Sequence, residues 1–282
     1  TLSALGWVGA GEMGLPMLRR ACDAGMAVQC FDWRAPRLAL AQSAGAVPVA
    51  DAALLARGVA RVVTMVYDDA ALLRTVSWLM PGLRAGSVLM DMSTVSPSAS
   101  AKVAEQLQAI GVLYLRAPVS GSAAVAEAGA LSVYASGPRV AFERSLDVLQ
   151  TFSCGQTYLG TGEEARVVKL AINLLVVNLT AVFGEALALG DAAGVDREVL
   201  MSCINSSVVA TRHSQLRGTA MATRRYTGSG SLRLSAKDLD MALTVAPQLS
   251  LPLTRQTRLR VARLMECGFA EIEISKLADD FD

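Results

Sequence analysis

The chain has 282 residues, of which 52% are hydrophobic, and its 26 basic and 25 acidic side chains leave a formal net charge of +1. This length suggests about two globular domains, and the apolar content excludes a disordered chain. The balanced charge gives no basic surface for nucleic acid or an anionic membrane, so we expect neither as a partner.

Short apolar segments alternate with helix-length segments between residue 2 and about residue 158. The apolar segments are residues 2–8, 28–31, 62–66, 88–92, 112–115 and 131–134. Most are rich in Val, Leu or Met without strict alternation, which is typical of strands covered on both faces. The helical segments between them include residues 15–24, 37–43 and 98–110, and Ser96 and Pro97 suit the start of the last one. This alternation predicts an α/β domain of the Rossmann type with a parallel, doubly wound sheet.

The pattern changes after Gly160 and Gly162. Residues 163 to about 193 contain no proline and are apolar on nearly every face, which predicts a helix of about 30 residues that is buried all round. The mean hydropathy of +0.40 is high, but polar side chains interrupt this helix, so we expect it to join two domains rather than span a membrane. The rest looks helical, with breaks near residues 227–231 and 247–252. We therefore predict a Rossmann domain over residues 1–162 and an all-helical domain over residues 163–282.

Cysteine and histidine usage bears on compartment and metal binding. The five cysteines are scattered and form no CxxC pair, which indicates reduced thiols in a cytoplasmic protein. Residues 1–14 lack a basic leader, so we do not expect a signal peptide. The single histidine, His213, argues against a histidine zinc site, and we expect no metal.

A glycine-rich loop follows the first predicted strand and precedes a predicted helix. It consists of Gly9, Ala10, Gly11, Glu12, Met13 and Gly14. In this GxGxxG pattern the first glycine permits a tight turn, the second lets the backbone approach a pyrophosphate, and the third lets helix and strand pack closely. The positive end of the helix then faces the phosphate charge. These residues predict a dinucleotide site.

An acidic residue at the end of the second predicted strand bears on which dinucleotide is bound. Asp32 can accept hydrogen bonds from both ribose hydroxyls of NAD, and its charge would repel the 2′-phosphate of NADP. Arg34 and Arg37 follow closely, however, and an arginine can accept that phosphate. We therefore favour NAD and leave NADP open.

Lysine is rare in this chain. Lys102, Lys169, Lys237 and Lys276 are the only lysines, and the other basic residues are arginines. Because lysine can lose its proton and arginine effectively cannot, Lys169 and Lys237 are candidates for proton chemistry. Lys169 lies early in the predicted long helix, and Asn173 projects from the same helical face four residues later. The competing interpretation is a lysine whose head reaches solvent near the helix end.

Five stretches, in this order, resemble the β-hydroxyacid dehydrogenase family, which includes 3-hydroxyisobutyrate dehydrogenase and tartronate semialdehyde reductase. They are the loop from Gly9 to Gly14 with Pro16-Met17; Asp91-Met92-Ser93-Thr94 with Pro97; Ala117-Pro118-Val119-Ser120-Gly121; Gly160-Thr161-Gly162 leading to Lys169 and Asn173; and Lys237-Asp238-Leu239 with Ala242. Each motif is modest by itself, but together they span nearly the whole chain.

The resemblance implies a role for each matching residue. It implies that Lys169 is the catalytic acid/base. It implies that the substrate is held by Ser93, Ser120, Gly121, Ser122 and Asn173. It implies that the cofactor lies along Gly9, Ala10, Gly11, Glu12, Met13, Asp32, Arg34, Met65, Val66, Thr94 and Lys237.

The implied chemistry is physically reasonable. Hydride transfer requires a proton at the substrate oxygen, and a lysine whose pKa is lowered by burial or neighbouring cations can exchange it near neutral pH. A turn such as Ser120-Gly121 offers a hydroxyl and backbone N–H groups to a substrate carboxylate.

Three positions depart from the family pattern. Ser122 stands where a second glycine is usual and either adds a hydroxyl to the substrate site or narrows it. Ile172 replaces an asparagine often found beside Asn173, and Val66-Tyr67 replaces a common Leu-Pro next to the cofactor. These departures leave the reaction class intact and put the particular substrate in doubt.

We therefore expect an NAD(P)-dependent dehydrogenase or reductase that acts on a small hydroxy acid or semialdehyde. The expected substrate bears a carboxylate and is of the 3-hydroxyisobutyrate, tartronate semialdehyde, glyoxylate or threonate type. The alternatives are an imine reductase-like enzyme, against which Lys169 argues, and a dinucleotide-binding protein without activity. The chain has no GxSxG hydrolase motif. Its apolar helical half and the resemblance suggest a homodimer or homotetramer.

Overall fold

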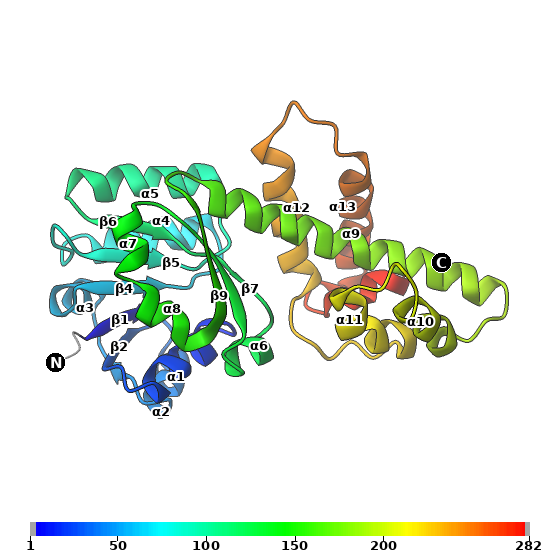
Figure 1. Ribbon diagram of the computed structural model, residues 1–282, viewed down its shortest axis with the longest axis horizontal. Coiled ribbons are helices and arrows are strands. Elements are labelled where there is room, and N and C mark those ends of the chain that lie inside the picture. The colour runs from blue at the N-terminus through cyan, green and yellow to red at the C-terminus, as the bar shows by residue number, and fades with distance from the viewer. Residues whose placement is uncertain (1–3, 280–282) are drawn as a thin grey trace. The chain divides into compact units, whose positions relative to one another are not determined.

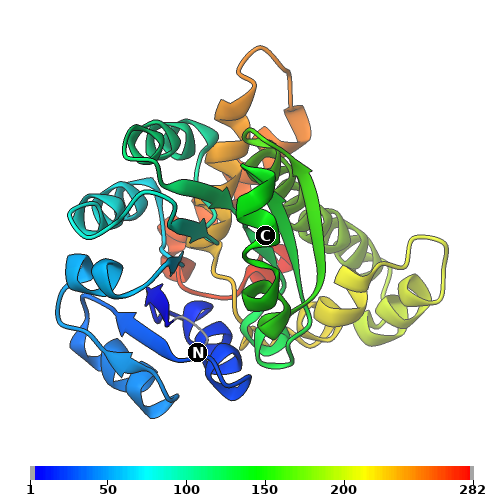
Figure 2. The same cartoon turned by 60° about the vertical axis from the view of Figure 1, so that its left-hand side comes forward.

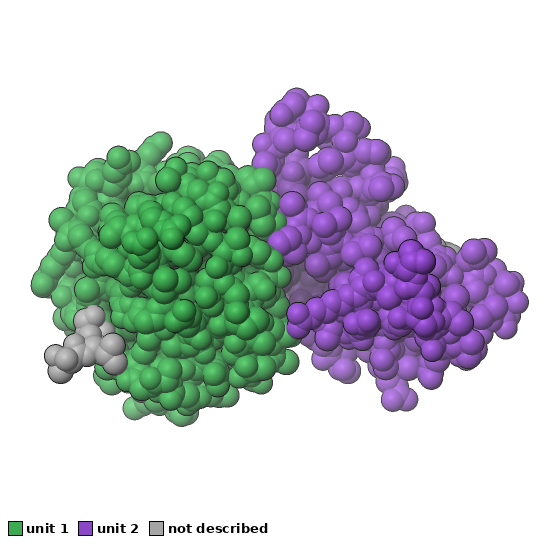
Figure 3. All heavy atoms as spheres, in the orientation of Figure 1, with its two compact units in different colours: residues 1–169 green, residues 170–282 purple. Residues whose placement is uncertain are grey.

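The computed structural model describes residues 4–279, and the chain divides into two units, Thr1–Lys169 and Leu170–Asp282, which Figure 3 colours separately. The first unit is a Rossmann-type α/β domain and the second is helical, so the predicted fold class is confirmed. The division falls after Lys169, inside a helix, whereas the sequence placed it after residue 162. The start of that helix belongs to the first unit because Arg166 is bonded within it, as described below.

The first unit is built on one sheet whose strand order is β3-β2-β1-β4-β5-β6-β8-β7, with β9 paired to β8 (Figure 1). Its strands are β1 (Leu5–Val8), β2 (Val28–Phe31), β3 (Val47–Pro48), β4 (Arg61–Thr64), β5 (Val88–Asp91), β6 (Leu113–Arg116), β7 (Val119–Ser120), β8 (Leu131–Ser136) and β9 (Ser153–Gly160). Strands β1 to β6 are parallel, as predicted. The prediction is wrong for β8, which runs antiparallel to β6 and β7. Only residues 121–130 separate β7 from β8, too few for a parallel crossover of about a dozen or more residues.

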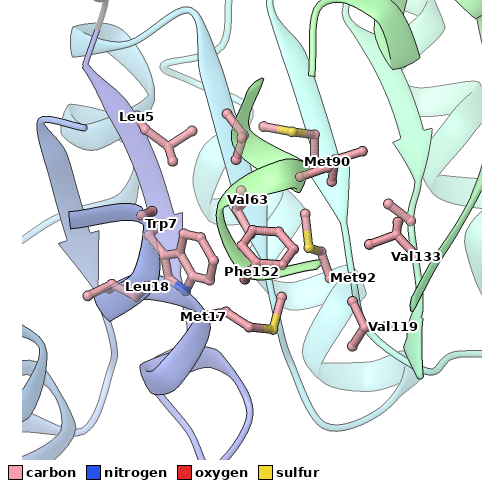
Figure 4. Close-up of a cluster of buried hydrophobic side chains, with 14 of the residues drawn as sticks. Leu5, Trp7, Met17, Leu18, Val63, Met90, Met92, Val119, Val133 and Phe152 are labelled. Atoms are coloured by element: carbon pink, nitrogen blue, oxygen red, sulfur yellow. The ribbon is translucent and has the colours of Figure 1, made fainter. Parts of the chain in front are cut away.

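Helices cover both faces of this sheet (Figure 2). They are α1 (Gly14–Asp23), α2 (Ala35–Ser43), α3 (Ala52–Gly58), α4 (Asp69–Leu79), α5 (Pro97–Ala109), α6 (Ala123–Glu127), α7 (Arg139–Glu143) and α8 (Leu146–Phe152). Adjacent residues of β1 belong to different apolar clusters: Trp7 packs edge-on against Phe152 on one face (Figure 4), and Val8 joins the cluster on the other. Helix α5 begins as predicted, with Pro97 in its first turn and the Ser96 hydroxyl accepting the Ala99 N–H.

The second unit contains most of α9 (Glu164–Ala192) and the helices that follow it. These are α10 (Arg197–Asn205), α11 (Arg212–Thr223), α12 (Leu232–Val245), α13 (Pro252–Leu264), the π-helical η1 (Met265–Phe269) and the 3₁₀-helical η2 (Ile274–Asp279). Both predicted breaks are confirmed, since they fall on either side of α12.

Helix α9 differs from its prediction in one respect, because it is not buried all round. Val177 and Ala181 on one side share an apolar cluster with residues of α12 and α13. Leu175, Val182 and Leu189 on another side are 57%, 53% and 74% exposed. By length and composition alone, α9 is the one helix among the described residues that could cross a membrane, a test that the core helix of a soluble protein also passes.

Candidate active site

The loop between β1 and α1 brings its backbone against the end of β4. Gly9 has a φ of +97°, and a Cβ on it would lie 2.2 Å from the Met65 carbonyl oxygen. A Cβ on Gly14 would lie 2.0 Å from the Gly9 carbonyl oxygen. Around Gly11, by contrast, the nearest atom to such a Cβ is a guanidinium nitrogen of Arg34 at 3.9 Å. Gly9 and Gly14 are therefore needed for the loop itself, whereas Gly11 faces the open side, as expected where a pyrophosphate approaches.

Helix α1 starts at this loop without a side-chain cap. Met13 occupies the capping position but provides no hydrogen bond, and the first turn contains no acidic residue. The N–H groups and the positive end of the helix are thus suited to an anion. Ala10 is buried and Glu12 is exposed in the same loop.

Asp32 follows β2 and fixes this loop from the side. Its side chain is buried, and its Oδ2 accepts the Ala10 N–H at 2.9 Å while its Oδ1 accepts the Arg34 N–H at 2.9 Å. The Arg34 Nε lies 3.4 Å from the same Oδ1, and the Arg34 side chain is 44% exposed. Because a carboxylate oxygen accepts more than one hydrogen bond, Oδ2 retains capacity for a ribose hydroxyl. The loop from Gly9 to Gly14 leaves space that larger side chains would occupy, and the buried Asp32 carboxylate lies beside it. This arrangement fits a dinucleotide.

A second group of polar residues links the loops after β4 and β5. The Ser93 side chain is fully buried, donates to Asp91 Oδ1 at 2.6 Å and accepts the Val66 N–H at 2.9 Å. Its hydroxyl therefore holds two loops together. Its backbone N–H donates to Asp91 Oδ1 at 3.2 Å and its carbonyl oxygen accepts from Arg166 at 2.6 Å, so every polar group of Ser93 is bonded within the protein. Thr94, the next residue, is half-buried.

The first turn of α9 is anchored to this group by Arg166. Arg166 and Asp91 form an ion pair with a distance of 2.5 Å, and both side chains have no exposed surface. Tyr114 also donates to Asp91 Oδ2, at 3.1 Å, and burial raises the pKa of its phenol, which stays protonated. Neither Asp91 nor Arg166 was assigned a role from the sequence. Asp91 was visible as the first residue of one motif, whereas nothing around Arg166 distinguished it from other arginines.

The turn after β7 is shaped by a glycine and capped by a serine. Gly121 has a φ of +139°, and a Cβ on it would lie 2.6 Å from the Leu131 side chain. The Ser122 hydroxyl accepts the Val125 N–H and so caps α6. Ser120, the last residue of β7, is half-buried. The extra hydroxyl of Ser122, relative to the family pattern, thus has a local structural partner.

Two predicted residues lie on α9 one turn apart. Lys169 is half-buried and Asn173 follows it by four residues in the same continuous helix. The Asn173 Nδ2 donates to Asp238 Oδ2 at 2.6 Å, and the Lys237 Nζ lies 3.4 Å from Asp238 Oδ1. Asp238 is only 5% exposed, so a buried carboxylate fixes the Asn173 amide. In the sequence, Asp238 is visible only as part of a motif, directly after Lys237.

The described residues show no metal site, and the histidine has a structural partner. No group of three or more His, Cys, Asp or Glu side chains within residues 4–279 is arranged to hold a metal. The His213 Nε2 lies 2.9 Å from the Thr180 hydroxyl oxygen, and burial lowers the pKa of His213 to about 4.

Comparison with known proteins identifies the family. The NAD binding domain of 6-phosphogluconate dehydrogenase matches residues 4–160, and the NAD-binding domain of NADP-dependent 3-hydroxyisobutyrate dehydrogenase matches residues 163–277. The 3-hydroxyisobutyrate dehydrogenase of Pseudomonas aeruginosa is 32% identical over 265 residues, which cover 89% of each chain. The chain belongs to the β-hydroxyacid dehydrogenase family. It is therefore an NAD(P)-dependent oxidoreductase that acts on CH–OH groups, and the predicted family, enzyme class and cofactor class are confirmed.

Two further relatives cover most of this dehydrogenase. The L-threonate dehydrogenase of Cupriavidus necator is 31% identical, with 88% of this chain and 85% of that protein covered. A solved structure of 3-hydroxyisobutyrate dehydrogenase from Salmonella typhimurium is 26% identical and superposes with a TM-score of 0.88, covering 99% of both chains.

Proposed function

We propose that this dehydrogenase transfers hydride between NAD and a small carboxylate-bearing hydroxy acid or its semialdehyde. The substrates to be considered first are of the 3-hydroxyisobutyrate, tartronate semialdehyde, glyoxylate and threonate types. Relatives named as 3-hydroxyisobutyrate, 2-(hydroxymethyl)glutarate and L-threonate dehydrogenases support this substrate class. The observation that carries the proposal is Lys169, one helical turn before an asparagine whose amide is fixed by the buried Asp238.

The proposed roles follow from the chemistry of each group. The nicotinamide, when bound, supplies or accepts the hydride. Lys169 gives a proton to the substrate oxygen in reduction and takes it back in oxidation. Asn173 orients the reacting groups, and Ser120 and Gly121 donate hydrogen bonds to the substrate carboxylate. The turn at Ser122 completes the substrate site, and Ser93 supports it by holding the loops after β4 and β5 together.

Most of the residues proposed to hold the cofactor belong to the first unit, and Lys237 belongs to the second. The loop from Gly9 to Gly14 binds the pyrophosphate, and Asp32 accepts the ribose hydroxyls. Met65, Val66, Thr94 and Lys237 line the remainder. Asp32 favours NAD because its charge repels the 2′-phosphate of NADP. The exposed guanidinium of Arg34 can accept that phosphate, so NADP is the second candidate.

The test is the change Lys169→Ala. We expect it to abolish turnover while NADH still binds, because the amine exchanges the proton and does not hold the dinucleotide. Lys102→Ala, which removes an exposed lysine on α5, is the matched control and should retain full activity. Substantial turnover by the Lys169→Ala enzyme would refute the assigned role.

A substrate panel separates the alternatives. We expect NADH oxidation with glyoxylate or a semialdehyde and no turnover of cyclic imines. Turnover of imines alone would favour an imine reductase, and NADH binding without turnover of any carboxylate-bearing substrate would favour a protein without activity. The panel run with NADPH in parallel also tests the proposed preference for NAD.

The exposed apolar residues of α9 support self-association. Leu175, Val182 and Leu189 lie on one helix and are each more than half exposed. We propose that a second copy of the chain covers them, giving a homodimer or homotetramer in the cytoplasm. Sedimentation of the purified protein tests the oligomeric state.

A further inference from the structure

We propose that Arg166 is a positioning residue that sets Lys169 for proton transfer by locking the first turn of α9 to the loops after β4 and β5. This inference rests on the proposed function, in which Lys169 is the acid/base. It assigns a purpose to a fully buried arginine that bonds Asp91, Ser93, Ser100 and Tyr114 rather than the glycine loop or the turn after β7.

The guanidinium of Arg166 makes four hydrogen bonds. It donates to Asp91 Oδ2 at 2.5 Å, to the Ser93 carbonyl oxygen at 2.6 Å and to the Tyr114 hydroxyl at 3.0 Å. Its Nε is 3.3 Å from the Ser100 hydroxyl. The planar fork of an arginine fixes its own rotation and depth when several acceptors surround it, which a lysine ammonium would not do.

The partners of Arg166 are themselves hydrogen-bonded to the loops after β4 and β5. Asp91 accepts the hydroxyl of Ser93, and Ser93 in turn accepts the N–H of Val66. Thr64, the last residue of β4, donates at 2.9 Å to Asp91 Oδ1, the oxygen that also accepts the Ser93 hydroxyl. One hydrogen-bonded chain therefore connects the loops after two strands to the first turn of α9.

Lys169 lies three residues after Arg166, which is less than one helical turn and a rise of about 4.5 Å. Residues three apart are neighbours on a helix surface, so a rotation or slide at Arg166 is passed to Lys169 almost unchanged. The Ala165 N–H adds a second anchor through the Ser136 hydroxyl at 3.2 Å. Because misplacement by about 1 Å can cost about 100-fold in rate, this anchoring matters for an acid/base.

Stability alone explains this ion pair poorly. Two charges removed from water lose hydration that their attraction barely repays, and apolar residues of similar volume often serve the fold as well. What an apolar replacement cannot supply is the fixed orientation of one helix turn relative to two loops. The arrangement of Arg166 and Asp91 is therefore better suited to positioning than to stabilisation.

The first experiment compares Arg166→Met, Arg166→Lys and a matched control. For Arg166→Met we expect kcat to fall about 100-fold, with KM and the Kd for NADH within about threefold, because Asp91 still holds Ser93. Arg166→Lys keeps the charge without the planar fork. It should therefore be thermally more stable than Arg166→Met, yet its kcat should be about tenfold below that of the parent enzyme. Arg197→Met removes a buried arginine that bridges Asp191 and Asp279 in the second unit, and it should lower stability while leaving kcat within twofold.

The second experiment asks whether Arg166 acts through Lys169. Single-turnover rates are measured for Lys169→Ala with and without Arg166→Met, following the absorbance of the reduced nicotinamide. A positioning residue has nothing to position once the amine is gone, so the second change should alter the residual rate by less than about twofold.

The outcomes are distinguishable. A kcat within threefold of the parent enzyme in a folded Arg166→Met or Arg166→Lys variant overturns the inference. A further 100-fold loss in the Lys169→Ala background also overturns it, because Arg166 would then act by another route. High activity of Lys169→Ala itself refutes the proposed function instead.

Discussion

The contrast between two glycines of the first loop gives a quantitative prediction. A Cβ on Gly14 would lie 2.0 Å from the Gly9 carbonyl oxygen, and both partners are backbone, so the loop and α1 must separate. Such overpacking costs about 1 to 3 kcal/mol, and a contact this short belongs at the upper end. A Cβ on Gly11 meets no atom closer than 3.9 Å, so Gly11→Ala should be neutral or stabilise the fold by about 0.5 kcal/mol through a less flexible unfolded chain.

The two variants should therefore separate stability from cofactor binding. Gly14→Ala should lower Tm by roughly 6 to 12 °C, at about 2 to 4 °C per kcal/mol for a domain of this size. Gly11→Ala should keep Tm but weaken NADH binding at least about tenfold, because its methyl group occupies the space of the pyrophosphate. Thermal unfolding and a fluorescence titration with NADH measure both quantities. The reasoning fails if Gly11→Ala binds NADH normally, or if Gly14→Ala melts like the parent protein.

Three other changes test separate parts of the molecule. Asp32→Ser removes the charge beside Arg34, so the ratio of NADPH to NADH efficiency should rise about 10- to 100-fold; an unchanged ratio in paired assays would contradict the role of this carboxylate. His213 has its pKa lowered by burial to about 4, below the value of about 6.5 in the unfolded chain, so the unfolded state binds the proton first as the pH falls. Stability should therefore drop by about 2 kcal/mol between pH 7 and pH 5 in urea titrations, and the drop should shrink in His213→Gln. Asp238→Ala frees the Asn173 amide from its 2.6 Å bond, and kcat/KM of the folded variant should fall at least about tenfold; equal kcat/KM would show that the amide needs no such support.

The sequence predicted the strands whose apolar character is visible within a few residues. The strands β1 and β5 are buried along their whole length because both of their faces are covered, and such short apolar runs are visible in the sequence. Strand β9 was missed because its sequence, SCGQTYLG, is polar, contains two glycines and is only partly buried. The antiparallel direction of β8 follows from the short connection after β7, and β7 was not predicted because it has only two residues.

In the candidate site, too, some residues could be recognised from the sequence and others could not. The glycine loop and Asp32 could be recognised because a strand, a turn and a helix follow one another within a short segment. The pairing of Asp91 with Arg166 spans 75 residues, and no periodic pattern connects them. The Ser93 hydroxyl shows the limit of a motif, because the same serine that marks the site turns its side chain into the interior, toward Asp91 and Val66.

The position of the dividing line inside α9 has a practical consequence for anyone who wishes to express the halves of this enzyme separately. A polypeptide that stops at residue 162 would keep Asp91 in its interior after losing the only guanidinium bonded to that carboxylate in the described chain. Its partner piece would begin with Arg166 stripped of all four acceptors. A cut after Lys169, about two turns further along the helix, leaves every one of those bonds within a single fragment.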